Sequence, residues 1–382
     1  MKRLNILLPF VLSIVLFSGC SYKVEQKQTI SKANFQQIDW EDLEGFKSDD
    51  LTKALKVFIK DCEASKKDPR LNEACVKATL DTSLEDPQAF FINNFTPYQL
   101  ISDEGDKDGL ITGYYEPLLH GSYYKSKRFQ YPVYAVPENL ITVDLRAAYP
   151  SLEDYTLRGK LVGKKIVPYE TREEINAIDY KTTKFLKPIC FVDDKIELFF
   201  LQIQGSGKVL LPNGKFINIG YGGQNGRPYY SIGKKLLEEN AISKEEMSLQ
   251  SIKKWLLANP TRIDEILNLN QSYIFFTKSA KTATGSLGTE LTANRNIAVD
   301  RKNVPLGFPV FINTTNPITE EPINKLMVAA DTGGAIKGKI RADLFFGDGV
   351  KARELAGKMK QDGELFIFIP KTTPDTIDVK KE

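Results

Sequence analysis

The spacing of apolar side chains divides the chain into helical stretches and β-rich stretches. Over residues 48–100, apolar positions recur every three to four residues, which predicts helices. Ser48 stands before the first of them and is the expected N-cap. Two apolar faces follow from this spacing, one through Leu51, Leu55, Phe58 and Cys62 and one through Leu71, Cys75 and Ala78.

From residue 110 the apolar residues form short runs bounded by turn residues, which is the pattern of β-strands. The Pro212-Asn213-Gly214 segment predicts a hairpin turn between two of these strands. The strands expected in this first β-rich stretch cover residues 111–115, 131–136, 196–204 and 208–220.

Helical spacing returns over residues 230–270. Ser243 and Glu246 have the spacing of a capping box, so a helix is expected to begin there. The apolar pattern continues through Trp255 and is interrupted at Pro260. Because Trp255 repeats with its apolar neighbours, we expect it in the core rather than on a sugar-binding surface.

A second β-rich stretch begins at residue 273. Its short strands are separated by many glycines and prolines, which is typical of a closed β-barrel. The length of 382 residues suggests two domains, so we expect a mainly β protein with an α-helical N-terminal segment. The expected strands cover residues 273–276, 297–299, 310–312, 326–330, 344–346 and 365–369, before a charged tail of about a dozen residues.

The N-terminus has the pattern of an export signal. Residues 1–19 combine a basic start, an apolar run and terminal small residues, which predicts a secretory signal peptide. Cys20 then resembles the lipidated cysteine of bacterial lipoproteins, although Phe17 stands where that pattern usually has leucine. A plain cleaved signal is the alternative. We expect a lipid anchor at Cys20, a polar tether over residues 20–47 and a membrane-attached periplasmic protein, with Ser21 favouring the outer membrane.

Charge and histidine content exclude several classes of function. Removing the signal with its Lys2 and Arg3 leaves 50 basic against 49 acidic side chains, a formal charge of +1. This balance, without a long basic run, argues against a nucleic-acid partner. The single histidine, His120, cannot build a His-rich zinc site. We therefore expect no metal and no cofactor, carboxylates as the acid and base groups, and His120 at the surface without a chemical role.

Export makes disulfides possible, and Cys62 and Cys75 are the candidates. Two antiparallel helices joined by a turn over residues 65–69 would bring their sulfurs together. Closing so short a loop would stabilise the fold by about 3 kcal/mol. Two buried thiols are the alternative. Cys190 is left over and is expected to be buried and inert.

Two glycine-rich stretches, residues 204–208 and 220–226, invite comparison with phosphate-binding loops. The first lacks the upstream glycine of a P-loop, and the second lacks the dinucleotide-binding spacing. Both are better explained as tight turns along a groove, where backbone amides remain available for ligand oxygens.

Three aspartates near the C-terminus form the strongest chemical pattern. Asp300 and Asp331 each follow an apolar strand and precede a turn, and Asp343 lies in an Arg-Ala-Asp sequence before another apolar run. If the three converge, burial and mutual repulsion should raise the pKa of at least one of them. A carboxylic acid protonated near neutral pH is the group that donates to a glycosidic oxygen. The alternative is that these aspartates cap turns and helix starts.

At these residues the sequence resembles the 3D domain, named for three aspartates, and specifically the membrane-bound lytic murein transglycosylase A family. The similarity covers residues 110–370, and its motifs occur in a fixed order. They are TGYYEP at 112–117, ETREEI at 170–175, FFLQIQGSG at 199–207, YGGQNGRPY at 221–229, NQSY at 270–273 and the segment with Asp300, Asp331 and Asp343.

This resemblance implies a double-psi β-barrel built from both ends of the chain, residues 48–117 and 276–382. A second β-barrel, residues 118–275, is inserted into it, with a groove between the two. The resemblance gives the catalytic role to Asp343, with Asp331 and Asp300 as the other two aspartates of the motif. The residues expected to line the sugar groove are Thr112, Tyr115, Gln204, Ser206 and Gly207.

The same resemblance implies a mechanism. Protonated Asp343 donates to the oxygen that links N-acetylmuramic acid to N-acetylglucosamine in peptidoglycan. As a carboxylate it then accepts the proton of the muramic C6 hydroxyl, which closes a 1,6-anhydro ring. The expected partners are a peptidoglycan glycan strand and a membrane, with the protein a monomer that could join cell-wall synthesis or division machinery.

Two other functions fit parts of the pattern. Asp331-Thr332-Gly333 matches the signature of aspartic proteases, but the second copy that a single-chain protease needs is missing. A lipoprotein that binds glycan without cleaving it would share the signal and the groove and would need no titrating acid.

Overall fold

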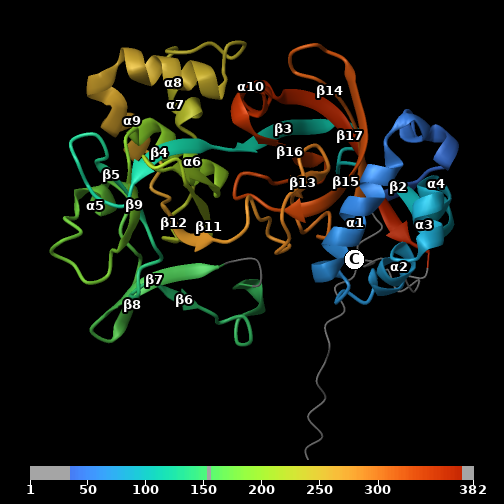
Figure 1. Ribbon diagram of the computed structural model, residues 1–382, viewed down its shortest axis with the longest axis horizontal. Helices are drawn as coiled ribbons and strands as arrows, with labels where there is room; N and C mark the ends of the chain where they lie inside the picture. The colour runs from blue at the N-terminus through green and yellow to red at the C-terminus, as the bar shows by residue number, and fades with distance from the viewer. Residues whose placement is uncertain (1–34, 153–155, 372–382) are drawn as a thin grey trace, which may run out of the picture.

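The computed structural model describes residues 35–152 and 156–371 of the 382 residues. The signal peptide, Cys20, Ser21 and the charged tail therefore lie outside the described residues. Within the described part, none of the helices is long and apolar enough to span a bilayer. The protein is mainly β and forms two lobes, shown in Figure 1.

Ten α-helices and seventeen strands are present in the described part. The helices are α1 (Leu51–Ser65), α2 (Asn72–Ala78), α3 (Asp81–Glu85), α4 (Pro87–Asn94), α5 (Arg172–Ala177), α6 (Lys195–Gln204), α7 (Ile232–Glu238), α8 (Leu249–Ala258), α9 (Ile263–Asn268) and α10 (Gly349–Lys358). The strands are β1 (Phe35–Gln37), β2 (Phe95–Leu100), β3 (Gly109–Glu116), β4 (Leu118–Ser122), β5 (Tyr131–Tyr134), β6 (Ile141–Val143), β7 (Leu157–Val162), β8 (Lys165–Val167), β9 (Pro188–Val192), β10 (Gly207–Leu210), β11 (Phe216–Gln224), β12 (Ile274–Ser279), β13 (Asn296–Val299), β14 (Pro309–Thr315), β15 (Pro322–Asp331), β16 (Arg341–Asp348) and β17 (Lys360–Pro370).

The first lobe is a closed barrel. Its sheet has the order β1-β2-β17-β14-β15-β13-β16-β3, and β3 pairs again with β17. The six strands from β17 to β3 therefore form a ring, and β1 and β2 extend it at one side. Two of the pairs, β13 with β15 and β16 with β3, are parallel. The closed barrel expected from the Gly- and Pro-rich strand pattern is confirmed, while the double-psi connectivity stays a prediction.

The second lobe is a six-stranded sheet that curls back on itself. Its order is β12-β11-β10-β4-β9-β5. An isolated bridge between Ala135, directly after β5, and Phe276 of β12 joins the two ends of this order. The hairpin predicted around Pro212 to Gly214 is present, because β10 and β11 pair in antiparallel register on either side of it. We refer to the two lobes as the 3D barrel and the insert barrel.

The chain crosses between the barrels twice. It leaves the 3D barrel at Pro117, between β3 and β4, and returns after Ser279, at the end of β12. The insert barrel therefore ends slightly later than the expected boundary at residue 276. Ion pairs link the barrels near the first crossing. Lys208 of β10 contacts Glu116 at 3.0 Å and Asp348 at 2.6 Å.

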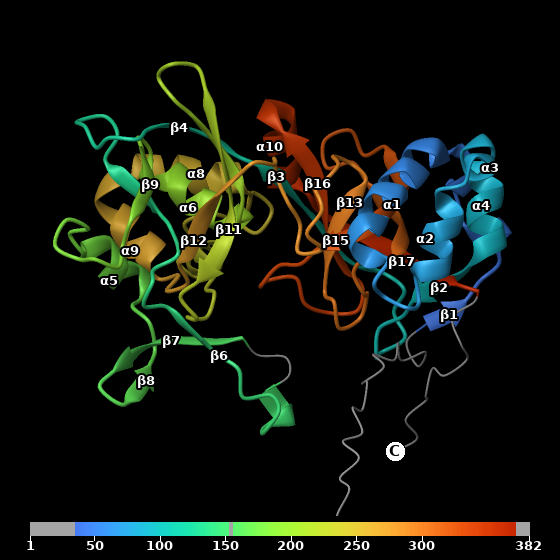
Figure 2. The same cartoon turned by 60° about the horizontal axis from the view of Figure 1, so that its bottom comes forward.

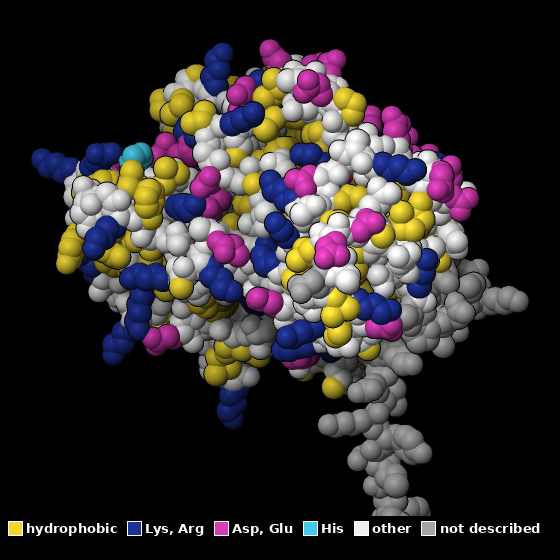
Figure 3. Space-filling model, turned by 45° about the vertical axis from the view of Figure 1, so that its right-hand side comes forward, with side chains coloured by type: hydrophobic (Ala, Val, Ile, Leu, Met, Phe, Trp, Pro, Cys, Tyr) yellow, Lys and Arg dark blue, Asp and Glu magenta, His cyan; other side chains and the backbone are white. Residues whose placement is uncertain are grey.

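A small antiparallel sheet, β6-β7-β8, projects from the insert barrel as an arm, visible at the lower left of Figure 1 and again in Figure 2. Its strands were not expected from the sequence, because two of them have only three residues and β7 contains both an arginine and a lysine. On the face of the molecule drawn in Figure 3, basic and acidic side chains are interspersed.

The N-terminal helices cover one side of the 3D barrel, and the predicted apolar faces of α1 and α2 are buried there. Cys62 and Cys75 form a disulfide between these two helices, which is the pairing considered from the sequence. The predicted N-cap was wrong. Asp50 caps α1 by accepting from the Lys53 amide at 2.9 Å, while Ser48 ends a 3-10 turn. Cys190 is buried, and burial raises the pKa of its thiol to about 12.

Three further expectations need correction. Residues 35–47 of the expected tether contain β1 and two 3-10 turns, because Trp40 and Phe46 pack into the barrel core. Residues 95–100, expected to be helical, form β2. Ser243 and Glu246 close a turn only, and the capping box of α8 consists of Ser248 and Ser251. His120 lies exposed on β4, which agrees with its expected surface position.

Residues 196–204, expected to be a strand, form helix α6. The side chain of Asp194 caps it by accepting from the Ile196 and Glu197 amides, and Gly205 ends it with a φ of +81°. The middle of the helix is a continuous apolar run because it is buried between two clusters, one that includes Leu201 and one that includes Phe199. Periodicity alone does not distinguish such a buried helix from a buried strand.

Candidate active site

A cleft of about 810 Å³ lies between the two barrels, and both contribute to its walls. The 3D barrel supplies carboxylates and the loops after its strands, whereas the insert barrel supplies amides, hydroxyls, tyrosines and glycines. The lining residues used below are Tyr114, Ser286, Ala298, Asp331 and Asp343 from the 3D barrel, and Gln204, Ser206, Tyr229, Lys278 and Lys281 from the insert barrel and the crossing after it.

Strand register places two of the three aspartates at one level of the 3D barrel. Ala298 of β13 is the register partner of Asp331 on β15 and of Asp343 on β16. Asp343 is in turn the register partner of Thr112 on β3. Because neighbouring strands lie about 4.8 Å apart, the two aspartates are separated by about 10 Å between their backbones. Both line the cleft.

Asp343 has one carboxylate oxygen held and one available. The Thr112 hydroxyl donates to Oδ1 at 2.7 Å, and Arg341 Nη2 donates to the Thr112 oxygen at 2.8 Å. None of the described residues donates a hydrogen bond to Oδ2. Burial raises the pKa of Asp343 to about 6; the Thr112 hydrogen bond and Arg341 oppose this rise, and Asp331 adds to it. The group is therefore part protonated near neutral pH, as expected for at least one of the aspartates.

Asp331 is fully occupied by donors. Its Oδ1 accepts from the Ser286 amide at 2.9 Å, the Ser286 hydroxyl at 2.8 Å and the Thr332 amide at 2.8 Å. Its Oδ2 accepts from the Tyr114 hydroxyl at 3.2 Å. Burial raises the pKa of Asp331, and these hydrogen bonds partly oppose the rise. Asp331 thus places a carboxyl held by hydrogen bonds on the strand next but one to Asp343.

The loop that carries Ser286 is fixed from two sides. Its Leu287 amide donates to the Ala330 carbonyl at 2.9 Å, directly before Asp331. From helix α1, Lys60 donates to the Thr292 hydroxyl at 2.7 Å and to the Glu290 carbonyl. The N-terminal helices therefore hold a loop of the cleft wall, although they do not reach the cleft themselves.

Asp300 does not join the other two aspartates, so the expected convergence of three was wrong. It lies outside the cleft lining, and its carboxylate accepts from the Lys302 amide at 3.2 Å and the Gly338 amide at 3.1 Å. Asp300 directly follows the last residue of β13, and its carboxylate binds backbone amides. This is the turn-capping role considered as the alternative. Through Gly338 it fixes the loop whose earlier part, Gly333 to Ile336, lines the cleft.

The five expected groove residues divide into three groups. Gln204 and Ser206 line the cleft. Thr112 contacts Asp343 rather than the open cleft. Tyr115 and Gly207 do not line it: Tyr115 is buried in the core of the 3D barrel with its hydroxyl unpartnered among described residues, and Gly207 packs against the Pro117 carbonyl.

Sequence reasoning missed several lining residues. Tyr114 could have been found, because strand alternation puts it on the same face as Thr112 and puts Tyr115 on the opposite face. Ser286 carried no signal, since it lies in a loop without a motif of its own. The tyrosine Tyr229 and the lysines Lys278 and Lys281 also line the cleft. Among the described residues, no group of three or more potential metal-ligating side chains occurs.

Comparison with known protein families gives a separate match for each lobe. The family model described as the MltA specific insert domain matches residues 110–277, and the model described as the 3D domain matches residues 295–369. Fold and site therefore define a 3D-domain protein whose barrel carries an MltA-specific insert across a cleft that contains two aspartates.

The chain belongs to the MltA family of membrane-bound lytic murein transglycosylases. The crystal structure of MltA from Neisseria gonorrhoeae is 33% identical with a TM-score of 0.77, over 88% of this chain and 92% of that chain. LtgG of Burkholderia pseudomallei, a lytic transglycosylase, is 37% identical with a TM-score of 0.58, over 90% and 97% of the two chains. Membrane-bound lytic murein transglycosylase A of Vibrio cholerae is 31% identical over 272 residues, which span 69% of this chain and 66% of that protein.

Proposed function

We propose that this protein is a lytic transglycosylase that cleaves the β-1,4 bond between N-acetylmuramic acid and N-acetylglucosamine in peptidoglycan and leaves a 1,6-anhydromuramic end. The observation that carries the proposal is Asp343. Its pKa is raised to about 6, one of its oxygens is free, and it faces a cleft lined by groups suited to a sugar chain. Family membership supports the same activity.

In the first step, protonated Asp343 donates its proton to the bridging oxygen, and the bond from that oxygen to the muramic C1 breaks. Positive charge then develops at C1. The raised pKa of Asp343 favours this donation, because an acid is most effective when its pKa lies near the working pH. Departure of the N-acetylglucosamine end leaves Asp343 as a carboxylate.

In the second step, the muramic C6 hydroxyl attacks C1 and closes the anhydro ring. Its proton passes to the Asp343 carboxylate, which restores the starting state. An ordinary glycosidase divides such work between two carboxylates. Here Asp331 has its oxygens engaged by Ser286, Thr332 and Tyr114, so it is poorly placed to activate a water or to attack a sugar. An internal nucleophile removes the need for either role.

Asp331 then acts on Asp343 and on the developing charge. Its negative charge raises the pKa of Asp343. The same charge would favour the positive centre that forms at C1. Thr112, held by Arg341, fixes the orientation of the Asp343 carboxyl.

The N-terminal features place this activity in the periplasm. A lipid anchor at Cys20, in the outer membrane, would tether the enzyme beside the peptidoglycan layer. The relative in Vibrio cholerae is named membrane-bound, and a crystal structure of MltA from Escherichia coli, which shares this fold with a TM-score of 0.70, contains bound chitohexaose. We propose a monomer acting on glycan strands; contact with cell-wall synthesis or division machinery stays a prediction.

The test digests purified peptidoglycan with the wild-type protein, with Asp343→Asn and with Asp300→Asn, followed by mass analysis of the products. We expect anhydro-muropeptides from wild type and from Asp300→Asn, and a loss of at least about 10³-fold for Asp343→Asn, the scale of a removed general acid. Wild-type product levels from Asp343→Asn would refute its role. Peptide fragments would instead indicate a protease, and binding to peptidoglycan without any release would indicate a glycan-binding protein.

A further inference from the structure

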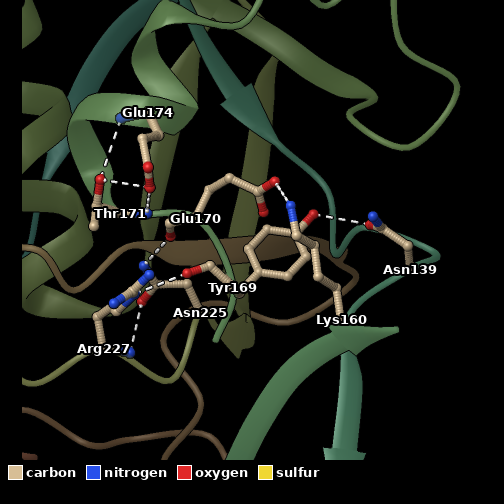
Figure 4. Close-up of polar contacts among 8 residues, drawn as sticks. All are labelled: Asn139, Lys160, Tyr169, Glu170, Thr171, Glu174, Asn225 and Arg227. Carbon is tan, nitrogen blue, oxygen red and sulfur yellow. Dashed lines mark hydrogen bonds and ion pairs between the residues drawn. The ribbon is translucent and has the colours of Figure 1, made fainter. Parts of the chain in front are cut away.

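The arm formed by β6, β7 and β8 is held firmly at its base, as Figure 4 shows. Lys160 of β7 forms an ion pair with Glu170, and the backbone carbonyl of Glu170 accepts from Asn225 Nδ2 at 2.8 Å. The Tyr169 hydroxyl donates to Asn139 at 2.9 Å, and Asn139 lies in the turn that leads into β6. The arm is therefore a fixed projection of the insert barrel and lies outside the described cleft lining.

Strand alternation gives the arm two different faces. Arg158 and Lys160 point to the face that meets the insert barrel, because Arg158 contacts Gly226 and Lys160 contacts Glu170. Leu157 and Leu161, which alternate with them along β7, point to the opposite, outer face. Register places aliphatic side chains together on this outer face: Leu161 opposite Ile166, and Leu157 opposite Val143.

The outer aliphatic face is uncovered in the described structure. Leu157, Leu161 and Ile166 are 37%, 59% and 51% exposed, and none belongs to a hydrophobic cluster of the core. The turn that joins β7 and β8 carries Lys164, and Lys165 is the first residue of β8. Both are exposed, and the register opposite Val162 turns Lys165 to the other face of the arm tip. An exposed aliphatic surface with lysines at its tip is unusual for a soluble monomer and indicates an interaction surface.

The position of the arm favours one partner. In Figure 2 the arm extends below the insert barrel, and β1 lies at the lower edge of the other lobe, so both face the same side in that view. The proposed anchor, Cys20, precedes Phe35 of β1 by 15 positions. A chain of that length reaches at most about 50 Å. β1 therefore lies within about 50 Å of the proposed anchor, and the arm extends to the same side of the molecule in that view.

We propose that the outer face of the arm rests on the anionic surface of the membrane to which the protein is anchored, a contact that depends on the proposed anchoring. Leu161 and Ile166 would enter the boundary between headgroups and acyl chains, while Lys164 and Lys165 would meet lipid phosphates. A sugar chain would be met by polar and aromatic groups, as in the cleft. This second contact fixes the orientation of the cleft relative to the membrane, which a single flexible attachment point leaves free.

The experiment uses the mature chain with Cys20→Ser, so that no acyl group contributes. Its co-sedimentation is measured with vesicles of phosphatidylcholine alone and with vesicles that also contain phosphatidylglycerol. The variants are Leu161→Ser with Ile166→Ser, and Lys164→Gln with Lys165→Gln. The matched control is Ile318→Ser, since Ile318 is 43% exposed in the turn between β14 and β15 of the other barrel.

We expect binding to the vesicles that contain phosphatidylglycerol, a loss of about fivefold in affinity per lysine removed, a comparable loss for the aliphatic pair and no change for Ile318→Ser. Absence of vesicle binding, or binding that ignores both pairs of substitutions, would overturn the proposal. So would a dimer of the wild type that the aliphatic pair abolishes, because the face would then cover a second copy. Cleavage of soluble glycan fragments, measured in parallel, should be unchanged in all variants. This measurement separates a failure of the membrane-contact proposal from a failure of the proposed activity.

Discussion

The two walls of the cleft are built in different ways. On the 3D barrel, Asp343, Asp331 and Thr112 stand on neighbouring strands, and their positions follow from backbone register. On the insert barrel, Gln204, Ser206 and Tyr229 come from a helix end and from loops. Neighbouring strands therefore hold the groups proposed to react, while a helix end, loops and strand residues such as Lys278 line the part proposed to bind. Variants on the first wall should change kcat and its pH dependence, and variants on the second should change KM.

The largest effect after loss of Asp343 itself is expected for Asp331→Asn. The Asp331 charge raises the pKa of Asp343, so its removal should lower that pKa. The acid form of Asp343 is then lost at lower pH, and the alkaline limb of the kcat/KM profile should move to lower pH. At neutral pH the rate should fall about tenfold if the shift is one pH unit. The measurement is a pH–rate profile on glycan fragments.

Asp300→Asn is the matched control, because Asp300 binds the Lys302 and Gly338 amides away from the cleft lining. The alkaline limb of the kcat/KM profile of Asp300→Asn should stay at the wild-type pH. If the alkaline limb of Asp331→Asn coincides with the wild-type limb, Asp331 does not influence the pKa of Asp343.

The sequence predicted the first wall better than the second. Asp331 was found because an apolar run that ends in aspartate marks a strand end, where functional groups are often placed. Asp343, which precedes an apolar run, was found through the family resemblance. The family resemblance correctly pointed to Thr112 and Gln204 near the site. It also pointed to Tyr115, whose side chain faces the barrel core because side chains alternate along β3. Asp300 shares the same sequence pattern as Asp331, and only the fold shows that it binds backbone instead.

The second wall depends on contacts distant in sequence. Helix α6 was mistaken for a strand, since a helix buried between two apolar clusters has no polar face to reveal its period. Ser286 reaches Asp331 from a loop that is held in part by Lys60, more than 200 residues earlier in the chain. Residues 35–47 have a tether-like composition, yet Trp40 and Phe46 bind them to the barrel. Such long-range packing leaves no local pattern.

On the insert wall, Tyr229→Leu tests binding. Tyr229 lines the cleft and is 44% exposed, so its ring is available to a sugar face. Loss of an aromatic contact worth about 1 kcal/mol should raise KM about fivefold and leave kcat unchanged. Tyr124→Leu is the control, because Tyr124 is 82% exposed and lies outside the lining. Steady-state kinetics on glycan fragments give both constants. A fall in kcat at constant KM would contradict the division of labour between the walls.

The last effect concerns stability rather than rate and should distinguish the walls without any substrate. Burial raises the pKa of Asp343 from 3.8 to about 6, so the folded state binds its proton more tightly than the unfolded state does. Above pH 6 the carboxyl is ionised in both states and the cost of burying its charge is fully present; below about pH 4 it is protonated in both and the cost vanishes. Asp343→Asn should therefore raise the free energy of unfolding by on the order of 2–3 kcal/mol at pH 8 and by little at pH 4. Thermal melts at the two pH values measure the difference, with Ser206→Ala on the insert wall expected to show none. An equal effect of Asp343→Asn at both pH values would mean that packing, and not a buried charge, sets the cost, and the strands would then hold an ordinary aspartate rather than a poised acid.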